Sequence, residues 1–546
     1  MRSSSAEGLR RCSSGLLLVP LVVALGLVAA SSAATPAKAH RSLSKSAASR
    51  HAAGVLVELE RAPALQEAAA LRRAGATLVE HDLQIWALPP QIARRLLPSL
   101  VRRGLARRIE ADRSLRVLSS RAGEAVLPGS EWWLRAIHAA KLTPPGPGKP
   151  VTVVDTGVDV YHPEFAGRPN TMLLNPQTGM DRPGDFHGTA VSSLIGAPGI
   201  GTLGVYPEVV LREWDASPNG DLRLSRIIAG IDAAMRAGPG VINLSLGGPV
   251  DDPLLREAVL DAVHRGSLVV AAQGEDRFGG SPQTFPADEA HVLTVVATDR
   301  QDSVYVDTNG SESNDLSAPG VEVEVAVPPS ASPSGYEMVT GTSYAAALVS
   351  GAAAWVWTKR PTLDPSQLFQ LLVRSARPLA PAYNSVSGYG ALDLRAALAA
   401  PAPPGDPFEP NDDVDMIRAG GMFKAGTPSL TNRVRKTAFI RGSLAQNADP
   451  RDVFRVWIPP HGSLAATATP HPAAVTLRAW RASTRSVLEG AKRQRRDLLA
   501  IDQGKGIARL RVSNRGRRGI YAYLEISLGP AQNSSYALAL STHSAP

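Results

Sequence analysis

The pattern of apolar and polar positions divides the chain into three parts. In the first, from about residue 52 to 120, apolar residues follow strand, helix, strand, strand, helix and strand periods in turn. The stretches are 55–59, 63–74, 77–79, 84–88, 92–103 and a last strand within 105–118. Pro98 lies inside the second helical stretch, where we expect it to kink or shorten the helix. This order predicts a small α+β unit of the split β-α-β type.

In the second part, short and continuously apolar runs alternate with helical stretches. The runs include residues 151–154, 241–245, 268–272 and 292–296, and the helical stretches include 225–237 and 253–265. Apolar strands without polar alternation, separated by helices, are typical of a buried parallel sheet with helices on both faces. Sites in such sheets lie beyond the carboxyl ends of the strands, and Asp155 stands at one such end.

The third part follows a proline-rich stretch near residue 401. Beyond it, short segments alternate strictly between apolar and polar residues, and Gly, Pro and Asn separate them. Examples are 453–458, 475–480, 508–512, 520–526 and 536–540. Period-two strands joined by turn residues predict a β-sandwich.

The N-terminus and the composition limit where the protein works. Arg2, Arg10 and Arg11 precede an apolar stretch over residues 16–27, and small residues follow it, as in a secretory signal peptide. The only cysteine, Cys12, lies within this segment, so we expect no disulfide in the mature protein. The formal charge is +9, but acidic residues are interspersed and no basic run contains aromatic residues. We therefore expect no nucleic-acid partner and no stable membrane span.

Three segments carry candidate chemistry. Ser343, in a Gly-Thr-Ser turn before a small-residue helical stretch, is a candidate nucleophile at a helix N-terminus. His187 begins a His-Gly-Thr segment, and Asp155 begins an Asp-Thr-Gly segment. Each has a structural alternative, since Ser343 could be only a helix cap and His187 a loop histidine. Aspartic proteases also contain Asp-Thr-Gly, but they need a second such motif, and this chain has no other.

Together these segments resemble the subtilisin-like serine proteases, the subtilases. The order Asp155, His187, Ser343 is that of the family, and further matches lie at residues 241–248, 285–287, 317–320 and 388–390. The resemblance covers about residues 132–400. It implies a serine endopeptidase in which Ser343 attacks the peptide carbonyl, His187 transfers the proton, Asp155 orients the imidazole, and an acyl-enzyme forms. It also implies that Ser245, Leu246 and Gly247 pair with an extended substrate, with residues 219–221 as a candidate opposite wall.

The chain departs from the family pattern at the oxyanion position. Where the family has asparagine after the apolar strand, this chain has Glu275, and Gln273 could substitute only if the turn were rebuilt. Ala190, Ala347 and Leu348 also replace residues that are usual in the family. Glu275 leaves an alternative open, namely a catalytically impaired subtilase fold that acts as a binding module.

The resemblance implies no cofactor for the chemistry. The family's calcium loop after the histidine helix is shortened here to residues 196–201, although Glu164 stands where a carboxylate ligand is common. A hard cation needs about six or more oxygen ligands. We therefore expect no metal ligands at the active site, and structural calcium is only weakly supported at this loop.

The flanking parts also resemble family accessories. The first part resembles an inhibitory prodomain removed by self-cleavage, and the third resembles the bacterial pre-peptidase C-terminal domain, which begins with Asp-Pro-Phe-Glu-Pro-Asn-Asp. We expect a secreted monomer, made as a zymogen, that acts on protein or peptide substrates and is inhibited by its own prodomain. The expected parts are a signal peptide (1–39), the prodomain (40–125), a subtilisin-like catalytic domain (126–400), a linker (401–405) and the C-terminal β-sandwich (406–546).

Overall fold

The computed structural model describes residues 54–121, 131–178, 186–446, 448–488, 491–503, 506–528 and 533–544. The predicted signal peptide, the first residues of the predicted prodomain and its end after Arg121 lie outside the described residues. Among the helices described, none combines the length and the apolar character that crossing a membrane requires.

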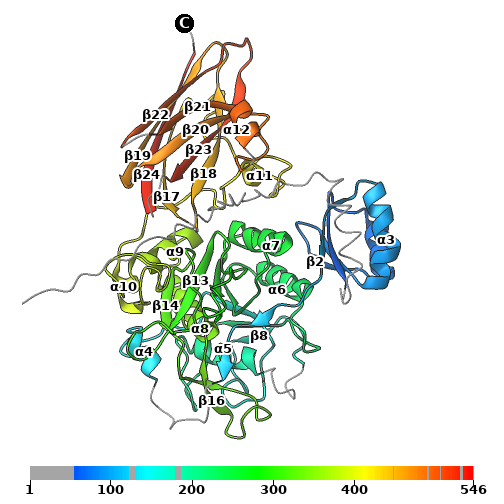
Figure 1. Cartoon of the computed structure of the whole chain (residues 1–546), viewed down its shortest axis with the longest axis vertical. Coiled ribbons are helices and arrows are strands. Elements are labelled where there is room, and N and C mark those ends of the chain that lie inside the picture. The colour runs from blue at the N-terminus through cyan, green and yellow to red at the C-terminus, as the bar shows by residue number, and fades with distance from the viewer. Residues whose placement is uncertain are drawn as a thin grey trace, which may run out of the picture. The chain divides into compact units, whose positions relative to one another are not determined.

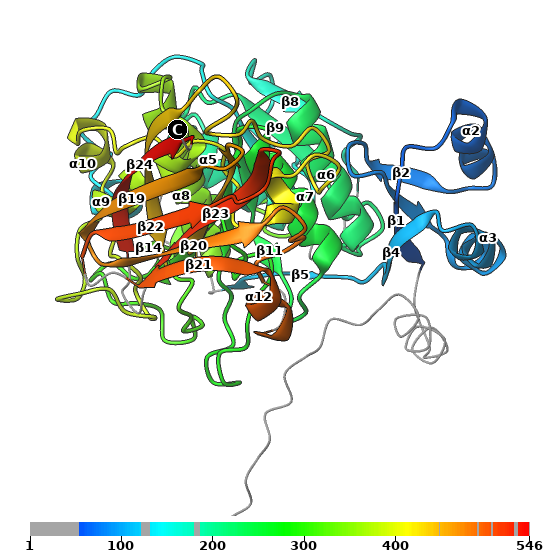
Figure 2. The same cartoon turned by 90° about the horizontal axis from the view of Figure 1, so that it is seen from above.

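The N-terminal α+β region has the predicted order of elements. They are β1 (Val55–Leu59), α2 (Leu65–Arg73), β2 (Thr77–Glu80), β3 (Ile85–Leu88), α3 (Pro90–Arg102) and β4 (Ala106–Ala111). The antiparallel sheet has the order β2-β3-β1-β4, and the two helices cover one of its faces (Figures 1 and 2). Pro98 lies inside α3 without ending it. Burial of Ala93 and Leu100, on either side of it, favours helix across the proline.

Alternation along β1 decides what each face of this sheet contacts. Val57 packs with Trp86 and the region's own helices, whereas its neighbour Leu56 packs with Ile85 in a cluster that includes helices α6 (Leu224–Arg236) and α7 (Pro253–His264). Successive side chains of a strand point to opposite faces. The sheet is therefore sandwiched between its own helices and those of the next region.

The central region is built on seven parallel strands in the order β14-β13-β12-β10-β7-β9-β8. They are β7 (Val151–Asp155), β8 (Thr171–Leu173), β9 (Leu211–Asp215), β10 (Val241–Leu244), β12 (Leu268–Ala272), β13 (Val292–Thr298) and β14 (Leu316–Pro319). Along β12, Leu268 and Val270 belong to the core cluster on one face of the sheet, and Val269 belongs to the cluster on the other face. The predicted parallel sheet with helices on both faces is thus confirmed.

Helices α6 and α7 cover one face of this sheet, and α5 (His187–Gly196) and α8 (Thr342–Lys359) pack on the other. Helix α8 is buried all round from Thr342 to Trp357, which its continuously apolar, small-residue sequence allows. The remaining elements are α4 (Trp132–Ala136), β11 (Leu246–Gly247), β15 (Val323–Ala326), β16 (Tyr336–Thr340), α9 (Pro365–Arg374) and α10 (Leu394–Ala399).

The C-terminal region is the predicted β-sandwich of two antiparallel four-stranded sheets, with orders β17-β24-β19-β22 and β18-β23-β20-β21. Alternate residues such as Leu524 and Ile526 enter its core. Its elements are α11 (Val414–Ile417), β17 (Thr437–Ala445), β18 (Arg451–Ile458), β19 (Ser463–Pro472), β20 (Val475–Arg481), α12 (Ala491–Asp497), β21 (Leu498–Gln503), β22 (Ala508–Ser513), β23 (Ile520–Leu528) and β24 (Asn533–His543).

Candidate active site

Asp155 and His187 form a buried pair at the carboxyl edge of the central sheet. Asp155 is the last residue of β7 and His187 the first of α5, and Asp155 Oδ1 lies 2.8 Å from His187 Nδ1. A Cβ at Gly188 would lie 2.2 Å from the Gly157 carbonyl oxygen, so only glycine lets α5 begin this close to the loop after β7. A carboxylate at Nδ1 holds the ring proton there and leaves Nε2 as the basic nitrogen.

Ser343 lies in the first turn of α8, where backbone N–H groups have no partner within the helix. Its hydroxyl oxygen lies 2.6 Å from the carbonyl oxygen of Leu118 and 3.1 Å from that of Ser245. Its backbone N–H also donates to the Leu118 oxygen, at 3.2 Å. The next residue, Tyr344, places its ring 5.8 Å from that of His187. His187 Nε2 is buried and has no hydrogen-bond partner among the described residues.

The segment that brings Leu118 to Ser343 is the chain's own stretch after β4, residues 112–121, which we call the tail segment. Its strand β5 (Arg116–Val117) pairs antiparallel with β11, so that Val117 faces Leu246 and Arg116 faces Gly247. After Leu118, β6 (Ser120–Arg121) pairs with β16. The tail segment therefore lies as an added strand along the residues that the sequence assigned to substrate binding.

The tail segment also pairs with residues next to those predicted as the opposite wall of the substrate site. Leu115 N–H donates to the Leu222 carbonyl at 2.8 Å, and Leu224 N–H donates to the Arg113 carbonyl at 2.8 Å. These bonds lie at residues 222–224, directly after residues 219–221, which the sequence indicated as the opposite wall. This pairing reaches Leu224, the first residue of α6.

The Leu118 side chain is buried between two glycines. A Cβ at Gly247 would lie 3.2 Å from Leu118 Cδ1, and one at Gly274 would lie 3.6 Å from Cδ2. Leu118 is only 2% exposed, whereas the side chain of Arg116 is exposed. The site therefore holds an aliphatic side chain directly before the carbonyl that Ser343 contacts.

Ser245 acts through its side chain as well as its backbone. Its hydroxyl donates to the Ser343 carbonyl at 2.9 Å and accepts from Asn243 Nδ2 at 2.9 Å. Asn243 Oδ1 accepts in turn from the hydroxyl of Ser350, which lies further along α8. This chain of bonds fixes the first turns of α8 to the end of β10, and with them the position of Ser343.

Glu275 lies beside the start of α8. Its Oε1 accepts from Thr342 N–H and, at 2.6 Å, from the Thr342 hydroxyl. Burial raises the pKa of Glu275, while the bonds from Thr342 and the nearby His187 oppose that shift. Gln273 is fully buried, and its side-chain amide has no hydrogen-bond partner among the described residues. Gln273 therefore does not replace the missing asparagine as a donor to Leu118.

Glu164, at the shortened loop, is occupied by protein donors. Its oxygens accept the N–H groups of Ile200, Gly201 and Thr202, at 3.3, 2.6 and 3.0 Å, and the Tyr336 hydroxyl at 3.0 Å. A carboxylate that accepts four hydrogen bonds has little capacity left for a cation.

A second group of ionisable side chains lies where the central sheet meets the C-terminal region. It consists of five carboxylates, four from buried residues and one from Glu409, whose side chain is only 4% exposed, and each has one buried oxygen without a donor among the described residues. His291, in the loop before β13, lies against them, with Nε2 2.5 Å from one carboxylate oxygen. We call these carboxylates the carboxylate cluster: Asp406, Glu409, Asp412, Asp449 and Asp452.

The carboxylate cluster has the chemistry of a hard-cation site. Oxygens of Asp406, Glu409 and Asp452 lie within 4.8 Å of one another, as do ligand atoms of His291, Glu409 and Asp449. Burial, together with the neighbouring carboxylates, raises the pKa of Asp406, Glu409 and Asp449 well above the usual range. Unpaired buried oxygens at this density fit a calcium-like ion, which takes six to eight oxygen ligands.

Sequence reasoning missed Leu118 and the carboxylate cluster. Leu118 had a usable signal, because it ends the apolar stretch of the first part just before the polar residues that lead to the second. The Asp-Pro-Phe-Glu-Pro-Asn-Asp stretch contains three of the cluster's carboxylates, but the sequence does not show that Asp449 and Asp452 fold back onto them.

Comparisons with known proteins identify relatives of the central region. The family model described as "Subtilase family" matches residues 146–391. Subtilisin from Bacillus pumilus is 32% identical over 269 residues, which cover 48% of this chain and 94% of that protein. Subtilisin Savinase from Lederbergia lenta is 35% identical over 267 residues, with the same two shares.

Among solved structures, fervidolysin from Fervidobacterium pennivorans, described as a keratinolytic enzyme related to subtilisin, superposes with a TM-score of 0.53. That similarity covers 84% of this chain and 68% of fervidolysin at 19% identity, and it supports the fold alone. The sequence matches carry the assignment: this chain belongs to the subtilase family and is a serine endopeptidase of the subtilisin type.

Proposed function

We propose that the protein is a secreted endopeptidase, made as a zymogen that cleaves itself between Leu118 and Ser119. One observation carries the proposal: the Leu118 carbonyl oxygen accepts from both the N–H and the hydroxyl of Ser343, while the tail segment pairs with β11 as a substrate strand would. The α+β region is then the prodomain, and its tail segment blocks the site until it is cut and released.

Asp155, His187 and Ser343 perform the reaction in this proposal. The Ser343 proton passes to His187 Nε2 as Oγ attacks the substrate carbonyl carbon, and Asp155 stabilises the imidazolium. The Ser343 N–H donates to the developing oxyanion. His187 then protonates the leaving amine as the C–N bond breaks, which leaves an ester on Oγ. Water, deprotonated by His187, hydrolyses that ester and restores the hydroxyl.

Glu275 takes the place of the second oxyanion donor. Its raised pKa favours a neutral carboxylic acid, which can donate a hydrogen bond where a carboxylate cannot. Its Oε1 accepts from Thr342, and this contact holds the carboxyl group at the start of α8. The proposed enzyme is therefore more active at lower pH than at higher pH.

The tail segment also indicates the substrate class. Leu118 fills a site between two glycines and Leu115 packs against the core cluster of α6 and α7, whereas the side chain of Arg116 between them is exposed. Protein segments that are cut after leucine, with a second leucine three residues earlier, fit this arrangement. Secretion rests on the signal-like residues 1–39, and the other predicted domain boundaries stay predictions.

We further propose that the carboxylate cluster binds a structural calcium ion, with no part in the chemistry. Its support is the set of buried oxygens without donors, drawn from residues 406–412 and 449–452. The ion would hold these two stretches together at the base of the β-sandwich.

Labelling with a fluorophosphonate tests the enzyme against the alternative of an impaired binding module. The uncut chain should react poorly, because Ser343 is fully buried beneath Leu118. The chain that begins at Ser119, once freed of the α+β region, should react at one site, and Ser343→Ala should abolish the labelling. A correctly cut, folded chain that is free of the α+β region and still does not react would favour the binding module.

A further inference from the structure

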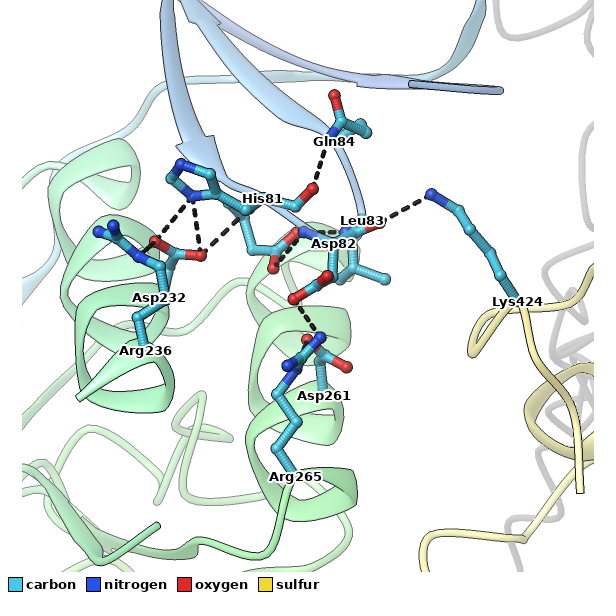
Figure 3. A network of polar contacts seen from close by, with 10 residues as sticks. His81, Asp82, Leu83, Gln84, Asp232, Arg236, Asp261, Arg265 and Lys424 are labelled. Carbon is cyan, nitrogen blue, oxygen red and sulfur yellow. Dashed lines mark hydrogen bonds and ion pairs between the residues drawn. The ribbon is translucent and has the colours of Figure 1, made fainter. Parts of the chain in front are cut away.

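The turn between β2 and β3 of the α+β region contacts helix α6 and the end of helix α7 (Figure 3). His81 contacts Asp232 of α6 through its backbone N–H at 3.1 Å and through Nδ1 at 3.0 Å. Asp82 forms an ion pair with Arg265, which directly follows α7. These contacts attach the α+β region to the catalytic region at a place remote from the tail segment.

A third part of the chain reaches the same turn. Lys424, in the loop after α11 of the C-terminal region, donates through Nζ to the Asp82 carbonyl oxygen at 2.7 Å (Figure 3). Asp415, in α11 itself, lies 3.2 Å from Arg107 of β4. Arg107 also donates to Glu58 of β1 at 2.6 Å, so its position is fixed within the α+β region. The C-terminal region thus contacts the α+β region at both ends of a ten-residue stretch.

Apolar contacts fix the stretch between these two points. The Phe423 ring stacks on His264, the last residue of α7, with centroids 4.0 Å apart and an interplanar angle of 2°. Met422 packs against the core cluster that contains Leu56 and Ile85 of the α+β region together with residues of α6 and α7. Residues 415–424 therefore pack against the catalytic region and also contact the α+β region. We call them the clasp segment.

We propose that the clasp segment is a retention site for the α+β region, so that the C-terminal β-sandwich delays release of the prodomain after cleavage. Cleavage at Leu118 frees one end of the tail segment but leaves the contacts of Lys424 and Asp415 unchanged. This proposal depends on the proposed function at one point, namely that the retained α+β region is the inhibitor of the enzyme. Two partly exposed polar contacts are each weak, so their combined loss should speed release about three- to tenfold.

The contact itself can be tested in the full-length Ser343→Ala chain, where no self-cleavage is needed. In the variant Asp415→Ala with Lys424→Ala, we expect hydrogen exchange in residues 77–88 to rise about three- to tenfold. The matched control is Lys436→Ala with Asp502→Ala, which removes one cation and one acid from the same β-sandwich outside the clasp segment. Exchange in β23 reports whether the sandwich itself stays intact.

A second measurement uses the chain with Ser343 present. The delay between the appearance of Ser119 as a new N-terminus and the onset of peptidase activity should shorten in the clasp variant and not in the control. Unchanged exchange in residues 77–88, with an intact β23, would overturn the clasp. A precursor that is never cut would instead count against the proposed zymogen and leave the exchange result standing.

Discussion

The carbonyl oxygen of Leu118 accepts two hydrogen bonds from Ser343, one from the backbone N–H at 3.2 Å and one from the hydroxyl at 2.6 Å. The two residues are 225 positions apart in the chain. A Cβ at Gly341, just before α8, would lie 2.7 Å from the Ser119 Cα, so the tail segment passes directly over the start of that helix. The peptide bond between Leu118 and Ser119 is therefore placed against the nucleophile.

Leu118 should set the rate of self-cleavage. Leu118→Ala removes roughly 1.5–3 kcal/mol of apolar burial between Gly247 and Gly274, so we expect processing to slow by about tenfold or more. Arg116→Ala, whose side chain is exposed in the same strand, is the control and should process at the normal rate. Gel analysis over time after expression measures both, and equal rates for the two variants would contradict the assignment of Leu118.

Glu275 should give activity an acidic bias. Because its pKa is raised, Glu275 is a neutral donor at lower pH, and activity should fall as rising pH ionises it. Losing one oxyanion donor costs roughly 2.7–4 kcal/mol, so Glu275→Asn should raise kcat by about tenfold or more at mildly alkaline pH and flatten the pH profile.

Glu275→Gln separates the donor from the charge. It keeps the length of the side chain, offers an N–H donor at every pH and does not titrate, so it should share the alkaline gain of Glu275→Asn. If kcat at mildly alkaline pH were unchanged or lower in both folded variants, Glu275 would not be an oxyanion donor.

Calcium should stabilise the protein through the carboxylate cluster. Free calcium at about 100 times its Kd would add about 2.7 kcal/mol to the free energy of unfolding, which corresponds to a rise in Tm of several degrees. Asp449→Asn with Asp452→Asn should abolish the rise. Glu164→Gln should keep it, because Glu164 already accepts four hydrogen bonds from the protein. A Tm that calcium and chelator leave unchanged would show that the cluster holds no ion.

Much of the fold could be predicted because the spacing of apolar residues along the chain reflects which side chains are buried. The continuous apolar run at β12 predicted a strand covered on both faces, and Leu268 and Val269 do enter different core clusters. The pairing of Asp155 with His187 followed from their motifs and order. Pro98 was a poor guide to the length of α3, because packing of the residues around it outweighed the cost of an internal proline.

The remaining features depend on contacts between distant segments. The tail segment pairs as a strand with β11, and the sequence, which predicted a last strand within residues 105–118, does not show that partner. The contact of Glu275 with Thr342 joins residues 67 positions apart. His291 of the catalytic region contacts the carboxylate cluster. Spacing along the chain cannot show which acidic turns come together in the fold.

Terminal analysis of the secreted protein tests the central claim most directly. The chain with Ser343 should yield a product whose N-terminus is Ser119, together with a fragment that ends at Leu118. Ser343→Ala, expressed in a protease-deficient host, should remain one uncut chain by intact mass. Normal cleavage of the Ser343→Ala chain, or a cut by the active chain at a bond other than that between Leu118 and Ser119, would contradict the account.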